Sequence, residues 1–375
     1  MRRIKFRKPY KLKNYRFGLV ALVLVLSIIG ILVVGSANES YQSKQIFGVV
    51  IGLVVMAIVS LIDYVWITNF YWILYGMSVF MLAIVLIPGI GVYVNGARRW
   101  INLGFTNFQP SELAKILLII FFAKFIMKHK EDLSEKQTIL KAVVLIAIPL
   151  VLILKEPNLS TTICTATLFC FLMYVGGLSY RFIGTVLLIT IPVAVIFLSI
   201  VVQPNQKLLD NYQQKRILAW LEPEKYASDE AYQQNNSVMA IGSGQLTGKG
   251  LNTSTIATVK DANFISEQQT DFIFSVIGEE LGFVGSVIII AILLLIVLQC
   301  IHVARNAKDT KGMLIAAGMG CLIAYQTFIN VGVATGVIPN TGLPLPFISY
   351  GLSFLISISI GIGVVLNVSM QKTSY

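Results

Sequence analysis

The sequence predicts an all-α, polytopic membrane protein with about ten transmembrane helices and one large extracytoplasmic loop. Of its 375 residues, 56% are hydrophobic and 13% are charged, and the mean hydropathy is +0.78. Soluble domains carry about 25% charged residues. Apolar runs of about 18 to 25 residues recur along the whole chain, and each can cross about 30 Å of hydrocarbon. This composition excludes a soluble protein.

The net charge of +11 is placed as in a membrane protein, not as in a nucleic-acid-binding one. Eight Lys and Arg residues lie within residues 1–16, before the first apolar run. Such a cluster holds an N-terminus in the cytoplasm and can contact anionic lipid. We therefore expect residues 1–16 to be a basic cytoplasmic tail and residues 17–370 to form a single transmembrane domain. The first apolar run is longer than a signal-peptide core, so we expect no cleavage. No nucleic-acid partner is expected.

The apolar runs define the predicted spans in order. They cover residues 17–37, 45–63, 70–88, 110–127, 139–155, 160–176, 181–202, 271–302, 312–335 and 347–368. With this count, the short loops on the predicted outside carry only Lys44, Arg98, Arg99 and Lys155. Many more Lys and Arg residues fall on the inside, as the positive-inside rule requires, and both termini are then cytoplasmic.

Three segments on the predicted outside differ from ordinary short connections. Residues 89–109 end at Pro110, which suits the first turn of a helix. Residues 203–270 form the large extracytoplasmic loop, and a loop of that length is usually functional. Within residues 336–346, the stretch 339–346 contains three prolines and a glycine, which break the helical backbone near the membrane surface. We expect all three segments to lie on the same side as Asp271.

Asp271 is the first candidate for catalysis. It stands where the large loop meets the apolar run 271–302. The helix dipole there favours the ionised form, whereas partial burial raises a carboxyl pKa. A carboxylate balanced between these effects could act as a general base for a hydroxyl group. A helix cap or an ion-pair partner is an equally good interpretation from position alone.

Other charged residues within apolar runs have structural alternatives. On a helix that begins at residue 271, Glu280 points away from Asp271 and Glu279 is turned by about 80°. Both glutamates are more simply read as paired structural groups, with Glu279 as a neighbour that supports Asp271. Glu112 and Lys115 have the i,i+3 spacing of an intrahelical ion pair. A buried ammonium such as Lys115 could also meet a ligand phosphate.

Cations on the outside form a second constellation that suits a substrate with a pyrophosphate, because guanidinium groups bind phosphate bidentately. They are Arg98, Arg99, Lys155, Lys215, Arg216, Lys249 and Lys260. A solvated loop surface is the plainer interpretation, and we prefer it for Lys215 and Lys260. The glycine-rich stretch 240–250 lacks the spacing of a P-loop, so no nucleotide site is expected.

Taken together, these stretches resemble the SEDS family of polytopic peptidoglycan glycosyltransferases, and the RodA branch more than the FtsW branch. The matching motifs occur in the family's order along almost the whole chain. They are Gly96-Ala97-Arg98-Arg99-Trp100, Gln109-Pro110-Ser111-Glu112-Leu113 with Lys115, Arg216-Ile217 to Pro223, Ala240 to Gly250, Thr270 to Gly285 and Asn340 to Gly351.

The resemblance implies an enzyme that polymerises lipid II at the outer face of the bacterial cytoplasmic membrane. The family's essential acidic residue falls on Asp271, which would deprotonate the acceptor GlcNAc 4-hydroxyl while undecaprenyl pyrophosphate leaves. A class B penicillin-binding protein and elongasome or divisome membrane proteins are the implied partners. No cofactor is certain, although a divalent cation (Mg²⁺ or Mn²⁺) would suit the pyrophosphate, and no dedicated metal ligands are seen. The expected substrate-binding residues are Arg98, Arg99, Gln109, Glu112, Lys115, Lys155, Arg216, Lys249, Thr270 and Ser349.

The chain departs from the family's pattern at several positions, which leaves room for altered substrate or partner preference. Asn158 replaces an acidic residue, Gln269 replaces a histidine, and Leu352 and Phe354 interrupt a Gly-Gly-Ser-Ser motif. Two other functions remain as alternatives: a lipid II flippase and a non-catalytic scaffold. A flippase would need polar residues across the full bilayer depth, whereas here they concentrate on the outside.

Overall fold

The computed structural model is mainly helical. It describes residues 12–94, 97–102, 104, 107–180, 184, 188, 192, 196, 199–203, 211–222, 225–226, 230–252 and 267–371. Most of the predicted tail 1–16 and of the predicted span 181–202 lies outside these residues. The helices are α1 Phe17–Ala37, α2 Glu39–Leu61, α3 Tyr64–Asn69, α4 Tyr71–Ile84, α5 Pro110–Lys128, α6 Lys136–Lys155, α7 Leu159–Val175, α9 Asn211–Leu221, α10 Glu230–Ser243, α11 Ile273–Arg305, α12 Thr310–Ala334 and α13 Leu352–Met370.

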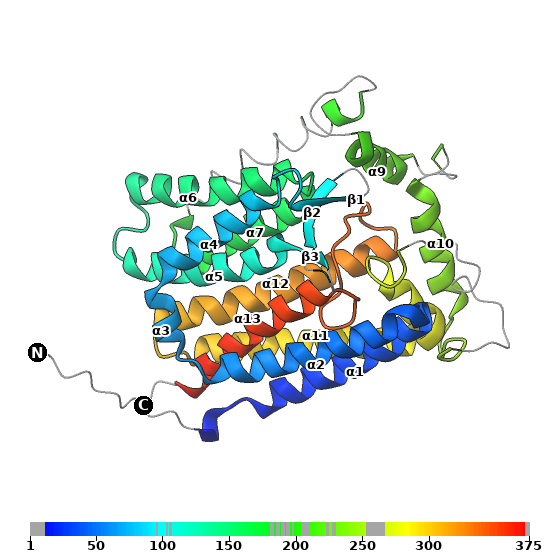
Figure 1. Cartoon of the computed structure of the whole chain (residues 1–375), viewed down its shortest axis with the longest axis horizontal. Coiled ribbons are helices and arrows are strands. Elements are labelled where there is room, and N and C mark those ends of the chain that lie inside the picture. Colours follow the sequence, from blue (N-terminus) through cyan, green and yellow to red (C-terminus); the bar gives the residue numbers. More distant parts are fainter. Residues whose placement is uncertain are drawn as a thin grey trace, which may run out of the picture.

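Most of these helices lie side by side along one direction (Figure 1). Among the described residues, six helices are long and apolar enough to cross a membrane, namely α1, α2, α6, α11, α12 and α13. Two shorter apolar helices, α4 and α7, accompany them. The chain is therefore a multi-pass membrane protein, as its composition predicts.

The predicted span boundaries agree with the helices except where local chemistry shifts them. Helices α1, α5, α6, α7 and α12 match within three residues. Helix α2 begins six residues earlier than predicted, because the side chain of Asn38 accepts a hydrogen bond from the Ser40 amide at 3.1 Å. Helix α13 begins five residues later, because the proline-rich segment continues to Gly351.

A small antiparallel sheet lies between α4 and α5, so the expectation of an all-α chain is wrong at this point. Its strands are β1 Gly91–Val94, β2 Ala97–Asn102 and β3 Asn107–Phe108, in the order β1-β2-β3. Val92 pairs with Trp100 and Ile101 pairs with Phe108. β-Branched and aromatic residues favour this pleated arrangement. The segment that the sequence predicts only as a loop is thus an ordered hairpin with a short third strand.

The predicted large loop 203–270 contains two helices, α9 and α10. Helix α10 packs against α11 and α12. The Gln234 side chain donates to the carbonyls of Val333 at 2.9 Å and Ile338 at 2.7 Å, and Ser237 donates to the carbonyl of Ala334 at 2.8 Å. These bonds attach α10 to the end of α12 and to the proline-rich segment that follows it.

Helix α11 is broken at Gly282, where φ is +67° and ψ is −165°. The segment after α10 pairs with the backbone groups that the break releases. The amides of Lys249 and Gly250 donate to the carbonyls of residues 279 and 280, each at 3.0 Å, and the amide of Phe283 donates to the Gln245 carbonyl at 2.8 Å. A break at membrane depth requires such partners, since an unpaired backbone group in hydrocarbon costs several kcal/mol. The glycine-rich stretch 240–250 thus has a structural role.

Candidate functional site

Asp271 lies in a turn directly before α11, which begins at Ile273 after Phe272. Its amide donates to the Glu267 carbonyl at 3.2 Å. Asn330 donates to the carbonyls of Asp271 at 2.9 Å and Leu343 at 2.8 Å, which ties this turn to the proline-rich segment. Because Asp271 precedes the helix, our angular comparison of it with the two glutamates of α11 does not apply.

The half-buried side chain of Asp271 faces a cavity of about 630 Å³. Many parts of the chain contribute to its wall: the start of α2, strands β2 and β3, the start of α5, the N-cap of α7, helix α9, the turn at residues 267–271, and the proline-rich segment with the start of α13. The lining residues include Tyr41, Lys44, Arg99, Trp100, Gln109, Glu112, Asn158, Arg216, Glu267, Gln269, Thr270, Gly342, Tyr350, Ser353 and Phe354. The cavity therefore joins carboxylates, guanidinium groups and aromatic rings from distant parts of the sequence.

Burial raises the pKa of Asp271 above its ordinary value of 3.8, while the charges of Arg216 and then Arg99 act in the opposite direction. The carboxylate and Arg216 flank Gly342, whose φ is +71°. A Cβ at that position would lie 3.2 Å from Oδ2 of Asp271 and 3.7 Å from Nη1 of Arg216. Arg216 also donates to the Asn340 carbonyl at 3.4 Å. Together these groups form a partly desolvated carboxylate beside a guanidinium group.

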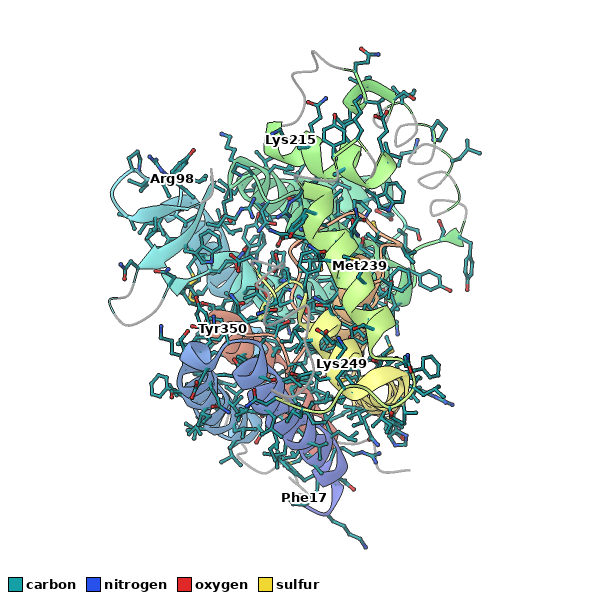
Figure 2. The ribbon with its side chains drawn as sticks, turned by 90° about the vertical axis from the view of Figure 1, so that its right-hand side faces the viewer. Phe17, Arg98, Lys215, Met239, Lys249 and Tyr350 are labelled. Atoms are coloured by element: carbon teal, nitrogen blue, oxygen red, sulfur yellow. The ribbon has the colours of Figure 1, made fainter. Side chains whose placement is uncertain are left out.

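The two neighbouring arginines of β2 have different surroundings, because successive side chains of a strand point to opposite faces. Arg99 lines the cavity, and its guanidinium donates to the carbonyls of Glu156, at 3.1 Å, and Pro157. Arg98 instead lies over the ring of Tyr93, 5.9 Å from its centroid, at the edge of the molecule (Figure 2). Of the predicted pair, only Arg99 lines the cavity.

Glu156, which follows α6, is fully buried, and neither of its carboxylate oxygens has a hydrogen-bond partner. Burial raises its pKa to about 8, and the charge of Arg99 only partly opposes this shift. The side chain is therefore mostly protonated at neutral pH. Asn158, two residues later, accepts a hydrogen bond from the Thr161 amide at 3.2 Å and caps α7. An asparagine can serve this capping role as well as the acidic residue that it replaces in the family's pattern.

The start of α5 contributes Gln109 and Glu112 to the cavity wall. The Gln109 amide donates to Oγ of Ser353 at 3.0 Å, which joins α5 to α13. Nζ of Lys115 lies 2.9 Å from Oε1 of Glu112, and both side chains are buried. The i,i+3 ion pair is thus present, and Lys115 lies behind Glu112 instead of lining the cavity.

Thr270 and Ser349 have different roles around the turn that contains Asp271. Thr270 lines the cavity. Ser349 is buried, donates to the Thr270 carbonyl at 2.7 Å and accepts from the Leu345 amide at 2.8 Å. Ser349 therefore fixes the proline-rich segment against the turn and does not line the cavity wall.

Three further predicted residues lie away from the cavity. Lys155 is exposed at the end of α6. Nζ of Lys249 lies 2.7 Å from Oε1 of Glu279, whose side chain is 1% exposed. Glu279 also accepts from Ser243 at 3.4 Å, so its described contacts support the break in α11 and not Asp271. Glu280 is likewise buried and accepts from Ser36 and from the Asn252 amide.

Sequence reasoning missed several residues of the cavity wall. Lys44 lies over the ring of Tyr41, and Tyr41 contacts Tyr350 with 4.7 Å between the ring centroids. Glu267 lies four residues before Asp271, and partial burial followed by the Asp271 charge raises its pKa. The placement of Lys44 on the predicted outside was the available signal for that residue. Nothing in the sequence pattern pointed to the tyrosine pair.

The described residues contain no group of three or more His, Cys, Asp or Glu side chains that could hold a metal ion. Three carboxylates line the cavity, namely Glu112, Glu267 and Asp271, and Glu112 is already paired with Lys115. Mg²⁺ is often bound by one or two carboxylates together with substrate phosphates. The donor set fits a cation that arrives with a pyrophosphate.

The fold and the cavity define a polytopic membrane protein with a polar site at one end of its helical bundle. The family model for FtsW/RodA/SpoVE cell cycle proteins matches residues 11–374, and this chain belongs to that family. It is 33% identical to the peptidoglycan glycosyltransferase MrdB of Escherichia coli K12, with 94% of this chain and 93% of the relative covered. It is 34% identical to the probable peptidoglycan glycosyltransferase FtsW of Nitrosomonas europaea, with coverage of 94% and 92%.

Solved structures share the fold. A chain from a study of how a peptidoglycan synthase complex coordinates polymerization and crosslinking has a TM-score of 0.78 and 28% identity, with coverage of 95% and 97%. The rod shape determining protein RodA of Thermus thermophilus gives a TM-score of 0.69 and 26% identity, with coverage of 96% and 98%. The predicted family resemblance is confirmed.

Proposed function

We propose that this chain is a peptidoglycan glycosyltransferase that polymerises lipid II into β-1,4 glycan strands at the outer face of the bacterial cytoplasmic membrane. One observation carries the proposal: Asp271, with a raised pKa, faces a cavity of about 630 Å³ that Arg216 and Arg99 also line. The relatives' names give the reaction class, and the cavity supplies groups suited to it.

Asp271 acts as the general base in this proposal. It removes the proton of the acceptor GlcNAc 4-hydroxyl as that oxygen attacks C1 of the donor MurNAc. The bond from C1 to the pyrophosphate oxygen breaks, and the configuration at C1 inverts from α to β. A raised pKa improves the base, because proton transfer is most efficient when the pKa lies near the working pH.

Arg99 and Arg216 bind the departing undecaprenyl pyrophosphate. Their guanidinium groups favour the charge that accumulates on the leaving group, so no second carboxylate is needed as an acid. Trp100, Tyr41 and Tyr350 offer flat apolar surfaces for sugar rings. A divalent cation held by Glu267 and the pyrophosphate would neutralise part of the same charge.

A crosslinking partner and the orientation are part of the proposal. The related chain from a peptidoglycan synthase complex supports pairing with a class B penicillin-binding protein within the elongation or division machinery. The Lys and Arg bias supports a cytoplasmic location for both termini and an outside location for the cavity. The identities to MrdB and FtsW are alike, so the preference for the RodA branch rests on the sequence motifs.

The deciding experiment compares wild type with Asp271→Asn, using purified protein, its cognate penicillin-binding protein and labelled lipid II. We expect loss of polymer by a factor of at least about 100, because a general base contributes about 10²–10⁴-fold. Glu222→Gln is a matched control, since that carboxylate is exposed and does not line the cavity. It should retain wild-type polymerisation.

Equal polymer from wild type and Asp271→Asn would exclude Asp271 as the base. A flippase makes a different prediction in sealed vesicles, namely lipid II translocation that requires Glu279 but not Asp271. If neither polymer nor translocation depended on these residues, the scaffold alternative would be favoured.

A further inference from the structure

A second cavity, of about 540 Å³, lies at the opposite end of α5 from Glu112. Tyr71 and Trp72 of α4 form one wall, Lys128 closes the end of α5, and Lys141 and Val144 of α6 form another wall. Lys128 follows Glu112 by 16 residues on α5, so the two are about 24 Å apart along the helix at 1.5 Å per residue. The two cavities share no lining residue.

The side chains that line this second cavity are apolar on one part and basic on the other. Trp72, Leu140 and Val144 are 51%, 64% and 52% exposed, on helices that are apolar overall. In a membrane these side chains face lipid. Lys128 and Lys141 lie at the ends of α5 and α6 that meet at residues 129–135. None of the described lining residues is acidic.

His129 adds to the basic part of the rim. Its Nδ1 lies 3.0 Å from the Phe125 carbonyl oxygen, and its ring lies 4.4 Å from the Phe125 ring, centroid to centroid. A carbonyl only accepts, so Nδ1 carries the hydrogen of this bond. The imidazole is thus held at the edge of the cavity beside Lys128.

The position of the second cavity in the bilayer indicates which ligand its basic and apolar residues can bind. An α5 of about 28 Å nearly spans the hydrocarbon core, so Lys128 and His129 lie at the membrane–water interface. Tryptophan and tyrosine are enriched at that level, and lysine stems extend their charges toward the headgroups there. The end of the bundle with Lys128 and Lys141 is also the one on which the Lys and Arg bias predicts the cytoplasm.

We propose that the cavity between α4, α5 and α6 binds an anionic phospholipid. The phosphodiester contacts Lys128 and Lys141, and an acyl chain lies along Trp72, Leu140 and Val144. Basic pockets between transmembrane helices are suited to anionic headgroups. A soluble anion would occupy only the basic part and leave the exposed apolar wall uncovered, so the complementarity favours a lipid.

Binding at this site would stabilise the packing of α4 and α6 against α5. The hydroxyl of Tyr75 on α4 already donates to the Leu145 carbonyl of α6 at 2.8 Å, beside the cavity. A lipid that contacts all three helices favours the arrangement it binds. Helix α5 also carries Glu112, which lines the Asp271 cavity and pairs with Lys115. The proposed lipid site does not depend on the function proposed for the Asp271 cavity.

Native mass spectrometry of the full chain in detergent tests the proposal, with phosphatidylglycerol and phosphatidylcholine titrated in parallel. We expect phosphatidylglycerol to bind more tightly than phosphatidylcholine. The double substitution Lys128→Gln with Lys141→Gln should weaken phosphatidylglycerol binding about 30-fold, from about 1 kcal/mol per lysine. It should leave phosphatidylcholine binding unchanged.

The matched control is Lys130→Gln with Lys136→Gln, which removes the same charge from two exposed lysines that do not line the cavity. Equal weakening in both pairs would show a general surface-charge effect and overturn the site. So would equal binding of the two lipids, an unaffected double variant, or displacement of phosphatidylglycerol by inorganic phosphate.

A second measurement keeps the proposal testable if the lysine variants fail to fold. Brominated acyl chains quench nearby tryptophan fluorescence, and Trp72 lines the proposed acyl path. Brominated phosphatidylglycerol should quench the wild type more than brominated phosphatidylcholine does, and Trp72→Phe should remove most of the difference. A difference that persists in Trp72→Phe would place the lipid elsewhere.

Discussion

Asp271 and Glu279 lie eight residues apart, yet they differ in their access to a ligand. Asp271 faces a cavity, whereas Glu279 is buried in an ion pair. Asp271 precedes α11, is half-buried and faces a cavity in which Arg216 and Arg99 act on it electrostatically. Glu279 lies within α11, is 1% exposed and pairs with Lys249 at 2.7 Å. A carboxylate that is buried and paired with a lysine is not accessible to a substrate hydroxyl group. Position relative to the helix start therefore separates the carboxylate that we propose to react from the structural one.

Among substitutions around Glu279, we expect Lys249→Met to cause the largest loss of stability. It removes the described cationic partner of Glu279, and breaking a buried ion pair in this way costs about 3–5 kcal/mol in similar cases. Unfolding in detergent measures this loss, and adding Glu279→Gln should recover most of it. Lys225→Met is the control, because the Lys225–Glu222 pair has the same charges but is exposed. Unchanged stability with weakened lipid II binding would instead make Lys249 a substrate-binding residue.

Arg216→Met tests the role of the cation beside Asp271. We expect polymerisation to fall by about 10²–10³-fold, as for loss of one group that stabilises transition-state charge. The variant also removes the main charge that lowers the pKa of Asp271. The acidic limb of the pH–rate profile should therefore move to higher pH. Lys215→Met, at an exposed neighbour in α9, should change neither quantity. An unmoved acidic limb would show that Asp271 does not control it.

Glu156→Gln tests whether a third carboxyl group, that of Glu156, contributes to the stability of the fold. The folded chain keeps its proton up to a pKa of about 8, whereas an unfolded chain loses it near 4.5. Stability therefore falls as pH rises between these values, by about 2–3 kcal/mol from about pH 5 to pH 7. The glutamine side chain of the variant has no proton to lose, so this fall should disappear in unfolding curves. Glu131→Gln, at an exposed site, should preserve it.

Gly342→Ala should have the smallest effect and the most local one. A non-glycine residue at φ +71° costs about 1–2 kcal/mol, and the new methyl group would lie between Asp271 and Arg216. Gly336→Ala is a close control, since φ there is +79° and the Cβ would meet only Val238. Both variants should lose similar stability, but only Gly342→Ala should slow polymerisation. Equal activities would show that spacing at Gly342 is not critical.

Sequence reasoning located the long apolar helices and Asp271 because these depend on local patterns. Apolar runs and loop charges carry most of the information about the spans. The sheet 91–108 was missed, because its alternation is short and lies within a segment rich in turn residues. The break at Gly282 was also missed, since it depends on pairing with residues 245–250 from another part of the chain.

The sequence predicted which types of residue form the candidate site, but not which individual residues line the cavity. Arg98 and Arg99 look equivalent in sequence, and the strand direction at β2 decides that only Arg99 lines the cavity. Lys249 looked like a ligand for phosphate, but the fold brings it to Glu279. Tyr41 and Tyr350 meet across more than 300 residues, a contact that no local pattern encodes.

The interruption of α11 has a consequence for the response to bilayer thickness. An unbroken 33-residue helix would be about 50 Å long, well beyond the hydrocarbon core. The part after Gly282 is about 34 Å long, and a helix adapts to a thinner or thicker membrane by tilting. The preceding nine residues are attached to α10 and to residues 245–250. We therefore expect Gly282 to absorb a tilt of the longer part, so that Asp271 keeps its distance from the cations across membranes of different thickness.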